Sequence, residues 1–132
     1  MSENKNLIQG LYEAFGRGDM AYVFAAFAED ISWTEAEGFP YAGTYIGADE
    51  ILSGVFMRIA ADWDGWAATP HEHIEEGDTV ITLGTYSGTC KATGKSMKAP
   101  LVHVWRIRDG KITSFVQHTD TALVREAMQA DQ

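Results

Sequence analysis

Residues 95–119 read KSMKAPLVHVWRIRDGKITSFVQHT, and this stretch decides the fold. Apolar and polar side chains alternate from Lys95 to Arg108 and again from Lys111 to Thr119, as the two faces of a strand require. Between the two runs lies Asp109-Gly110, a strong signal for a tight turn between antiparallel strands. We therefore predict a β-hairpin over this stretch.

Two further strands are predicted before this hairpin. Residues 79–91 are rich in Thr, Val, Ile and Tyr, which favour strands, and residues 66–75 form an earlier run. Gly77-Asp78 and Ala92-Thr93-Gly94 supply the intervening turns. The second half of the chain is therefore predicted to be a meander of four long antiparallel strands.

The first half of the chain has helical periodicity. One apolar stripe consists of Leu7, Ile8, Leu11, Tyr12 and Phe15. A short second helix, a strand over residues 31–35, a loop over 36–47 and a third helix through Ile59 follow, and a last helix runs to Met128. The expected order is α-α-β-α-β-β-β-β-α, an α+β domain.

Glycine and proline residues interrupt the predicted strands. Gly84, Gly88 and Pro100 are tolerated inside strands mainly at bulges and bends. A long sheet bent at these points would curve around the N-terminal helices as a cone with a cavity. Because Val102 and Val104 leave the outer face apolar as well, we expect a small hydrophobic ligand inside and a homodimer through the outer face.

Length and charge limit the class of protein. The 132 residues suit a single domain over 1–132, and the net charge is −9. No Lys/Arg cluster offers a phosphate-binding surface, so nucleic acid and anionic membranes are not expected partners. No apolar run approaches the ~20 residues of a membrane span, and no signal peptide is evident, so a cytoplasmic location is expected.

Glu35 is the first candidate for chemistry. Alternation places it on one face of its strand with Ile31 and Trp33. A carboxylate beside apolar groups resists ionisation, so its pKa rises toward the pH at which a general base works. The alternative is a strand-end glutamate whose carboxylate reaches solvent beside Glu37.

His103 is the second candidate, in the middle of the strand LVHVW. An imidazole facing the cavity could donate to a developing oxyanion or transfer a proton. The alternative is a core histidine hydrogen-bonded to a neighbour. The remaining pocket wall is expected to come from Trp33, Tyr45, Phe56, Tyr86, Trp105, Phe115 and Gln117.

Several phrases of the chain resemble the nuclear transport factor 2-like superfold, and within it the SnoaL-like, ketosteroid-isomerase-related branch. They are LYEAFGRGD at 11–19, VFAAFAED at 23–30, GTYIG at 43–47 and HVWRIRDGKI at 103–112. The resemblance covers roughly residues 5–128. It implies a cone-shaped sheet around helices, but this superfold hosts isomerases, cyclases, hydrolases, dehydratases and non-enzymes.

The resemblance also implies roles for individual residues. Glu35 falls at the position of the catalytic aspartate of ketosteroid isomerases, and His103 at that of their protonated aspartate. Leu11 replaces the oxyanion-hole tyrosine, and Tyr12, one residue further on, is expected to point elsewhere because one residue turns ~100° around a helix. Asp120 is nearest to the aspartate that polyketide cyclases of this superfold use, although it could instead be the N-cap of the last helix.

The last hairpin has two possible registers. A two-residue turn that pairs Arg108 with Lys111 would place His118 on the face of His103. A turn with a bulged glycine would shift the register by one and bring Gln117 there. The family pattern favours the second, so we expect Gln117 in the pocket.

Metals and cofactors are not indicated by the sequence. His71 and His73, at i and i+2 of a strand, should share a face, but no third ligand has a recognisable spacing. No nucleotide-binding glycine pattern is present. We therefore predict a metal-free, cofactor-independent protein.

The function expected from residues and resemblance together is that of an enzyme acting on a small hydrophobic carbonyl compound. It would abstract a proton and stabilise an enolate, as an isomerase or a cyclase. The alternative is a non-catalytic module that binds a small hydrophobic ligand on the same scaffold. A second alternative is a limonene-type epoxide hydrolase, for whose acid–arginine–acid relay Arg58, Arg106 and Arg108 give no clear sign.

Overall fold

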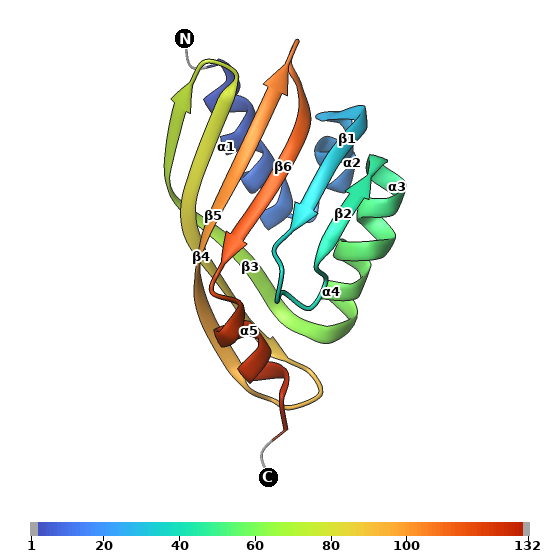
Figure 1. The fold of residues 1–132 in the computed structure, drawn as a ribbon, viewed down its shortest axis with the longest axis vertical. Helices are drawn as coiled ribbons and strands as arrows, with labels where there is room; N and C mark the ends of the chain where they lie inside the picture. The colour runs from blue at the N-terminus through green and yellow to red at the C-terminus, as the bar shows by residue number, and fades with distance from the viewer. Residues whose placement is uncertain (1–2, 131–132) are drawn as a thin grey trace.

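The computed structural model describes residues 3–130, so the outermost residues of the predicted domain over 1–132 lie outside this range. The helical segments are α1 (Glu3–Gly16), α2 (Met20–Ala25), α3 (Gly47–Ile51), the π-helical turn η1 (Leu52–Phe56), α4 (Met57–Asp62) and α5 (Thr121–Met128). The strands are β1 (Phe27–Glu35), β2 (Gly43–Ile46), β3 (Trp63–Glu76), β4 (Thr79–Cys90), β5 (Ser96–Arg108) and β6 (Lys111–Thr119). The predicted α+β class is confirmed (Figure 1).

The six strands form one curved sheet in the order β2-β1-β6-β5-β4-β3. The antiparallel meander from β3 to β6 is confirmed, but β1 runs parallel to β6, so the sheet is mixed and not wholly antiparallel. The predicted loop over 36–47 contains a short edge strand, β2, which pairs with β1 from Ser32↔Ile46 to Glu35↔Gly43. Because β2 has four mostly exposed residues, it lacks the apolar alternation that marks a strand in a sequence.

The β5–β6 hairpin has the expected register, but the bulge that produces it lies at a different position from the one expected. Asp109 and Gly110 both have positive φ, 52° and 75°, as in a two-residue turn, and Arg108 pairs with Lys111. A bulge at Thr113 then shifts the pairing by one residue. Gln117 therefore lies opposite His103, as expected, but the bulge is inside β6 and not at the turn glycine.

The bends of the long strands lie where glycine was expected to mark them. The pairing of β3 with β4 shifts opposite Gly84 and again opposite Gly88. A Cβ on Gly84 would collide with the backbone of Thr69. Pro100 causes no shift, because β5 pairs with β4 without interruption and the β6 ladder ends just before Pro100, at Leu101↔Thr119.

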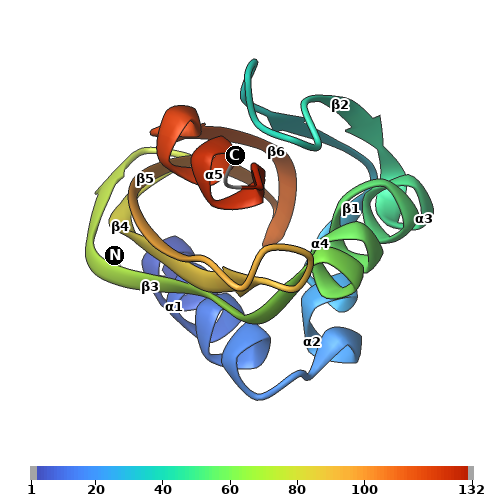
Figure 2. The ribbon, with the colours of Figure 1, turned by 90° about the horizontal axis from the view of Figure 1, so that it is seen from below.

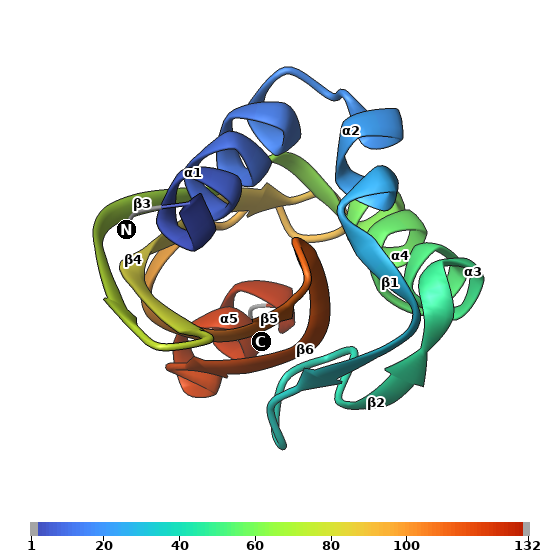
Figure 3. The same ribbon diagram turned by 90° about the horizontal axis from the view of Figure 1, so that it is seen from above.

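Two apolar cores lie on the concave face of the curved sheet, towards opposite ends of its strands. One core lies between α1, α2, α3 and the ends of β1, β5 and β6, around Ile8, Ile31 and Trp105. The other lies between α5, the loop before β2 and the opposite ends of β4 and β5, around Tyr41, Leu101 and Val124. Figures 2 and 3 show β3 to β6 curving around α5, with α1 and α2 side by side. Over residues 3–130, no helix combines the length and apolar character needed to cross a bilayer.

Candidate functional site

Four polar side chains are buried among the described residues, and all face the concave side of the sheet. They are Glu35, Thr82, His103 and Gln117. Thr82, His103 and Gln117 lie in one line, because Thr82 pairs with His103 and His103 pairs with Gln117 across β4, β5 and β6. Glu35 ends β1 two residues after Trp33, which pairs with Phe115. The register of the sheet therefore gathers the two chemical candidates from the sequence on one face.

His103 is held between two tyrosine hydroxyl groups. Its Nδ1 is hydrogen-bonded to the Tyr12 hydroxyl, and its Nε2 lies 2.5 Å from the Tyr86 hydroxyl. Burial lowers the pKa of His103 to about 3, so the imidazole is neutral at pH 7. A neutral imidazole has one donor and one acceptor nitrogen, and each finds a tyrosine here.

Tyr86 and Tyr12 are themselves fixed by further hydrogen bonds. Gln117 Nε2 donates to the Tyr86 hydroxyl at 2.9 Å, while Gln117 Oε1 accepts from the backbone N–H of Ala36 at 3.0 Å. Trp105 Nε1 donates to the Tyr12 hydroxyl at 3.2 Å. Gln117 thus links the residue after Glu35 to Tyr86, while His118 is exposed.

Glu35 differs from its neighbours because its carboxyl group is not satisfied. Its side chain is 4% exposed, and Oε2 has no hydrogen-bond partner among the described residues. The buried indole N–H of Trp33 is also unpartnered. Burial raises the pKa of Glu35 to about 8, and the nearby Trp33 offsets part of this rise. The solvent-exposed alternative for Glu35 therefore does not describe this structure.

Tyr12 is the functional-site residue that sequence reasoning missed. We expected it to point away from the site, and this is wrong, because its hydroxyl reaches both His103 and Trp105. The buried face of α1 is wide enough to include Leu11 and Tyr12 together. The spacing of Tyr12 from Ile8, four residues earlier on the same face, was the available signal.

Aromatic rings wall the polar cluster. Trp33 stacks on Phe115 at 3.8 Å between centroids, and Phe115 lies 4.7 Å from the His103 ring and 4.6 Å from Trp105. Phe56 meets Trp33 edge-on, with 5.4 Å between the ring centroids. These rings surround the site with apolar surface, which suits a flat, apolar ligand.

Some candidates lie outside this cluster. Tyr45 donates its hydroxyl to the backbone oxygen of Tyr41 at 2.7 Å. Asp120 is exposed and caps α5, where it accepts from Leu123 N at 3.2 Å. Arg58 lies over the Tyr41 ring, and Arg106 contacts Thr79 at the surface. The structure therefore does not bring Asp120 or these arginines to Glu35.

The two histidines considered as metal ligands face opposite sides of the sheet. A bulge in β3 between Pro70 and Glu72 lets His71 bond to Thr85 on the outer face, whereas His73 bonds to Thr82 on the concave face. The expectation that they share a face is wrong for this reason. Within residues 3–130, no three His, Cys, Asp or Glu side chains gather as a metal site would require.

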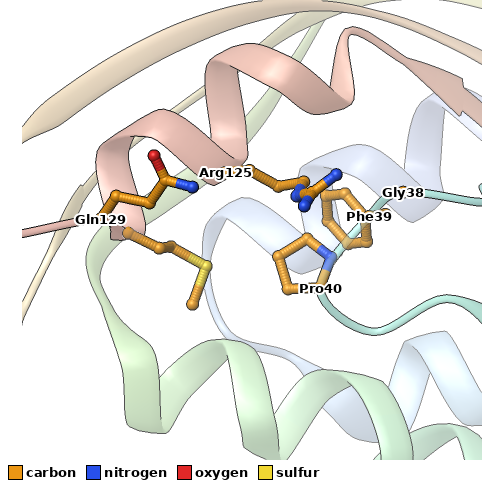
Figure 4. Close-up of a pocket in the computed structure, with 6 residues that line it drawn as sticks. Gly38, Phe39, Pro40, Arg125 and Gln129 are labelled. Atoms are coloured by element: carbon orange, nitrogen blue, oxygen red, sulfur yellow. The ribbon is translucent and has the colours of Figure 1, made fainter.

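A surface pocket lies outside the cluster, between the loop before β2 and α5. It has a volume of about 520 Å³ and is lined by Gly38, Phe39, Pro40, Arg125, Met128 and Gln129 (Figure 4). Phe39 is buried, and its ring stacks on Tyr86 at 6.3 Å. Phe39 thus separates this pocket from the hydrogen-bonded tyrosine behind it.

Sequence comparison decides the family. The model of the SnoaL-like domain matches residues 8–115. This chain belongs to the SnoaL-like family. No curated protein matches it.

Solved structures of the same fold agree with this family. An NTF2-like protein from Burkholderia thailandensis is 46% identical, with a TM-score of 0.93 over 98% of this chain and 99% of that one. An NTF2-like protein of unknown function from Burkholderia pseudomallei is 34% identical, with a TM-score of 0.91 over 98% and 100%. TerC, co-crystallised with polyporic acid, is 28% identical, with a TM-score of 0.88 over 96% and 98%.

Proposed function

We propose that this SnoaL-like protein is a cofactor-independent enzyme that moves a proton at the carbon next to the carbonyl group of a small apolar compound. The observation that carries the proposal is the Glu35 carboxyl group, which is buried, unpartnered at Oε2 and close to the Trp33 side chain. Unsatisfied buried polar atoms are costly, and such groups concentrate at functional sites. Isomerisation and aldol-type cyclisation both begin with this proton transfer.

Glu35 suits the role of a base that takes a proton and returns it. With a pKa of about 8, its carboxyl group is mostly protonated at pH 7, and roughly a tenth is ionised at any time. A base with a pKa near the working pH can remove a carbon-bound proton and later donate it back. The desolvated carboxylate is also a stronger base than one in water, for the same reason that its pKa is high.

Tyr86 is placed to stabilise the charge that develops on the substrate oxygen. Burial raises the pKa of its hydroxyl well above the ordinary value, the nearby Glu35 carboxylate adds to this rise, and Gln117 donates a hydrogen bond to it. His103 supports this donor from behind, because Nε2–H can donate to the Tyr86 oxygen and leave the hydroxyl proton free for the substrate. His103 therefore acts through Tyr86, not by direct contact with the oxyanion.

The proposal has a direct test with a probe ketone. 2-Tetralone is flat, apolar and readily enolised, so we expect the protein to catalyse exchange of its α-hydrogens with deuterium from D₂O, followed by proton NMR. Glu35→Gln should lower the catalysed rate by about 10²–10⁴-fold. Glu37→Gln, which removes an exposed carboxylate two residues away, is the matched control and should leave the rate unchanged.

The same assay separates catalysis from ligand binding alone. TerC was co-crystallised with polyporic acid, and a related ligand could occupy the site of this protein without turnover. Polyporic acid is therefore tested for binding by calorimetry beside the ketone. Binding with no catalysed exchange for 2-tetralone and further aryl ketones would favour a non-catalytic binding module.

A further inference from the structure

Four polar side chains lie side by side across four strands, and we call them the polar row. They are His73, Thr82, His103 and Gln117, each paired with the next from β3 to β6. Gln117 stands next to the Glu35 site, whereas His73 is only partly buried on the edge strand β3. The row therefore connects the interior of the protein to its surface.

The polar row and two tyrosines make a continuous series of hydrogen-bonding groups. From the interior, Tyr86 contacts Nε2 of His103, and Nδ1 of His103 contacts Tyr12. Burial raises the pKa of Tyr12, and the nearby Thr82 side chain offsets part of this rise, while Thr82 itself pairs with His103 across β4 and β5. Thr82 Oγ1 in turn lies 2.9 Å from Nδ1 of His73. Each of these five groups can both give and accept a proton.

We infer that Tyr86, His103, Tyr12, Thr82 and His73 form a proton relay that connects the Glu35 site to solvent, with His73 at its outer end. The inference deepens the proposed function and rests on it, because a proton held in a closed site can exchange with solvent only along a route to water. Glu35 and Tyr86 are both buried, and Phe39 covers Tyr86 on the side of the surface pocket. The relay would provide that route without opening the site.

The relay requires the Tyr12 and Thr82 hydroxyl groups to bond to each other between the observed hydrogen bonds, and its groups then allow donation in either direction. When donation runs outward, Tyr86 donates to Nε2 of His103, Nδ1–H donates to Tyr12, Tyr12 to Thr82, and Thr82 to Nδ1 of His73. A proton that arrives at the Tyr86 oxygen moves each of these protons one step, and one proton leaves Nε2 of His73 to water. Every group is neutral before and after, and donation now runs inward, ready to return a proton.

The fixed donors at both tyrosines are compatible with both directions. Gln117 Nε2 donates to the Tyr86 oxygen, and Trp105 Nε1 donates to the Tyr12 oxygen. Neither bond uses the hydroxyl proton of its tyrosine, so both hydroxyl protons remain available to the relay. At the outer end, burial and the Lys5 ammonium group lower the pKa of His73, which favours the neutral imidazole that can accept. Within residues 3–130, no hydrogen bond is found at Nε2 of His73, and the His73 side chain is partly exposed.

The relay is tested on the free protein, with no substrate, by NMR of the imidazole N–H of His103. Its exchange with water is measured at one fixed pH in ¹⁵N-labelled protein, beside the indole N–H of Trp105, which bonds to Tyr12 but is not a member of the relay. We expect the His103 proton to exchange faster than the Trp105 proton. Thr82→Val should slow the His103 proton by at least about tenfold, because exchange would then require local opening of the core.

Two matched controls distinguish the relay from a loss of packing. Thr85→Val removes the same hydroxyl from the outer face of β4, and His71→Phe is the outer-face counterpart of His73→Phe. We expect slower exchange only in the concave-face variants, and His73→Phe gives this test if Thr82→Val does not fold. The relay would be overturned if the His103 proton exchanged at the same rate in Thr82→Val as in Thr85→Val, or in His73→Phe as in His71→Phe. It would also be overturned if, in the wild type, the His103 proton exchanged no faster than the Trp105 proton.

The relay and the proposed function fail in different experiments. If the relay is wrong, Glu35→Gln still lowers the catalysed exchange of the ketone hydrogens. If the protein only binds its ligand, the His103 proton still exchanges through Thr82. Each result therefore bears on one inference alone.

Discussion

At the scale of single residues, the burial of Glu35 makes stability depend on pH. In the folded protein its pKa is about 8, against 4.5 for an ordinary glutamate. Between these values the folded state holds a proton that the unfolded chain has lost, so the contribution of Glu35 to stability is greatest below about pH 4.5 and falls as pH rises toward 8. Above pH 8 the carboxylate is ionised in both states, and the loss is complete.

Glu35→Gln should remove this dependence. The variant keeps the shape of the side chain but cannot ionise, so we expect it to unfold at a higher temperature than the wild type at pH 8 and at a similar temperature at pH 4. The gain at pH 8 should be on the order of a few kcal/mol, because one pKa unit corresponds to about 1.4 kcal/mol. Thermal unfolding of both proteins from pH 4 to 9 measures it, and parallel curves would contradict the buried carboxyl group.

The residues of the site differ in how far the sequence predicts them. Alternation within β1 and β5 was enough to place Glu35 and His103 on inward faces. The hydrogen bonds of Tyr12 and Tyr86 to His103 join residues far apart in the chain, and no local pattern encodes them. The prediction that Tyr12 points away from the site used only the angle of ~100° between successive helix residues. That angle does not show how wide the buried face of the helix is, and here the face includes both Leu11 and Tyr12.

At the scale of secondary-structure elements, the loop between β1 and β2 closes the site through Phe39. Its ring packs on Tyr86 and Tyr41 and forms part of the surface pocket beside α5. Phe39→Ala should therefore connect this pocket to the buried cluster. It should also cost about 3–5 kcal/mol of stability, as the loss of a core phenylalanine usually does.

The measurement is the rate of polyporic acid association, followed by stopped-flow absorbance. We expect Phe39→Ala to raise this rate by more than the Phe24→Ala control, which removes a partly buried ring of α2 that packs against the other core, away from the surface pocket. Comparison with the control separates an opened entrance from general loosening. Equal rates in the two variants would mean that the ligand enters elsewhere.

Elements with a strong period were predicted, and those held by tertiary contacts were not. The four strands of the meander alternate clearly, and Gly84 and Gly88 marked the bends, with a Cβ on Gly84 colliding with Thr69 and one on Gly88 lying tightly against Trp66. By contrast, β2 is held by pairing with β1, and the third helix contains a π-helical turn. The bulge at Thr113 places Gln117 opposite His103 on the buried face. The sequence of the turn does not show which residues of β6 will be buried there.

At the scale of the whole molecule, the convex face of the sheet is apolar across several strands. Ile81 pairs with Val104 and Val104 with Val116, while Leu83 pairs with Val102. All five are only partly buried, and they lie on the face opposite the polar row. The predicted division of β5 is confirmed, since Leu101, Trp105 and Ile107 are buried inside and Val102 and Val104 face outward.

This face leads us to predict a homodimer that forms through the convex side of the sheet. Apolar side chains contiguous across neighbouring strands favour association, and a face shared by identical chains can pair with itself about a twofold axis.

Light scattering at micromolar concentration should give twice the monomer mass. Val104→Glu should shift it to the monomer, because a buried unpaired carboxylate is costly. Met57→Glu makes the same charge change at a side chain that is 58% exposed on α4, and should leave the dimer intact. A monomeric mass for the wild type would rule out this interface. The same mass for Val104→Glu and Met57→Glu would rule it out as well, because the interface would then not contain Val104.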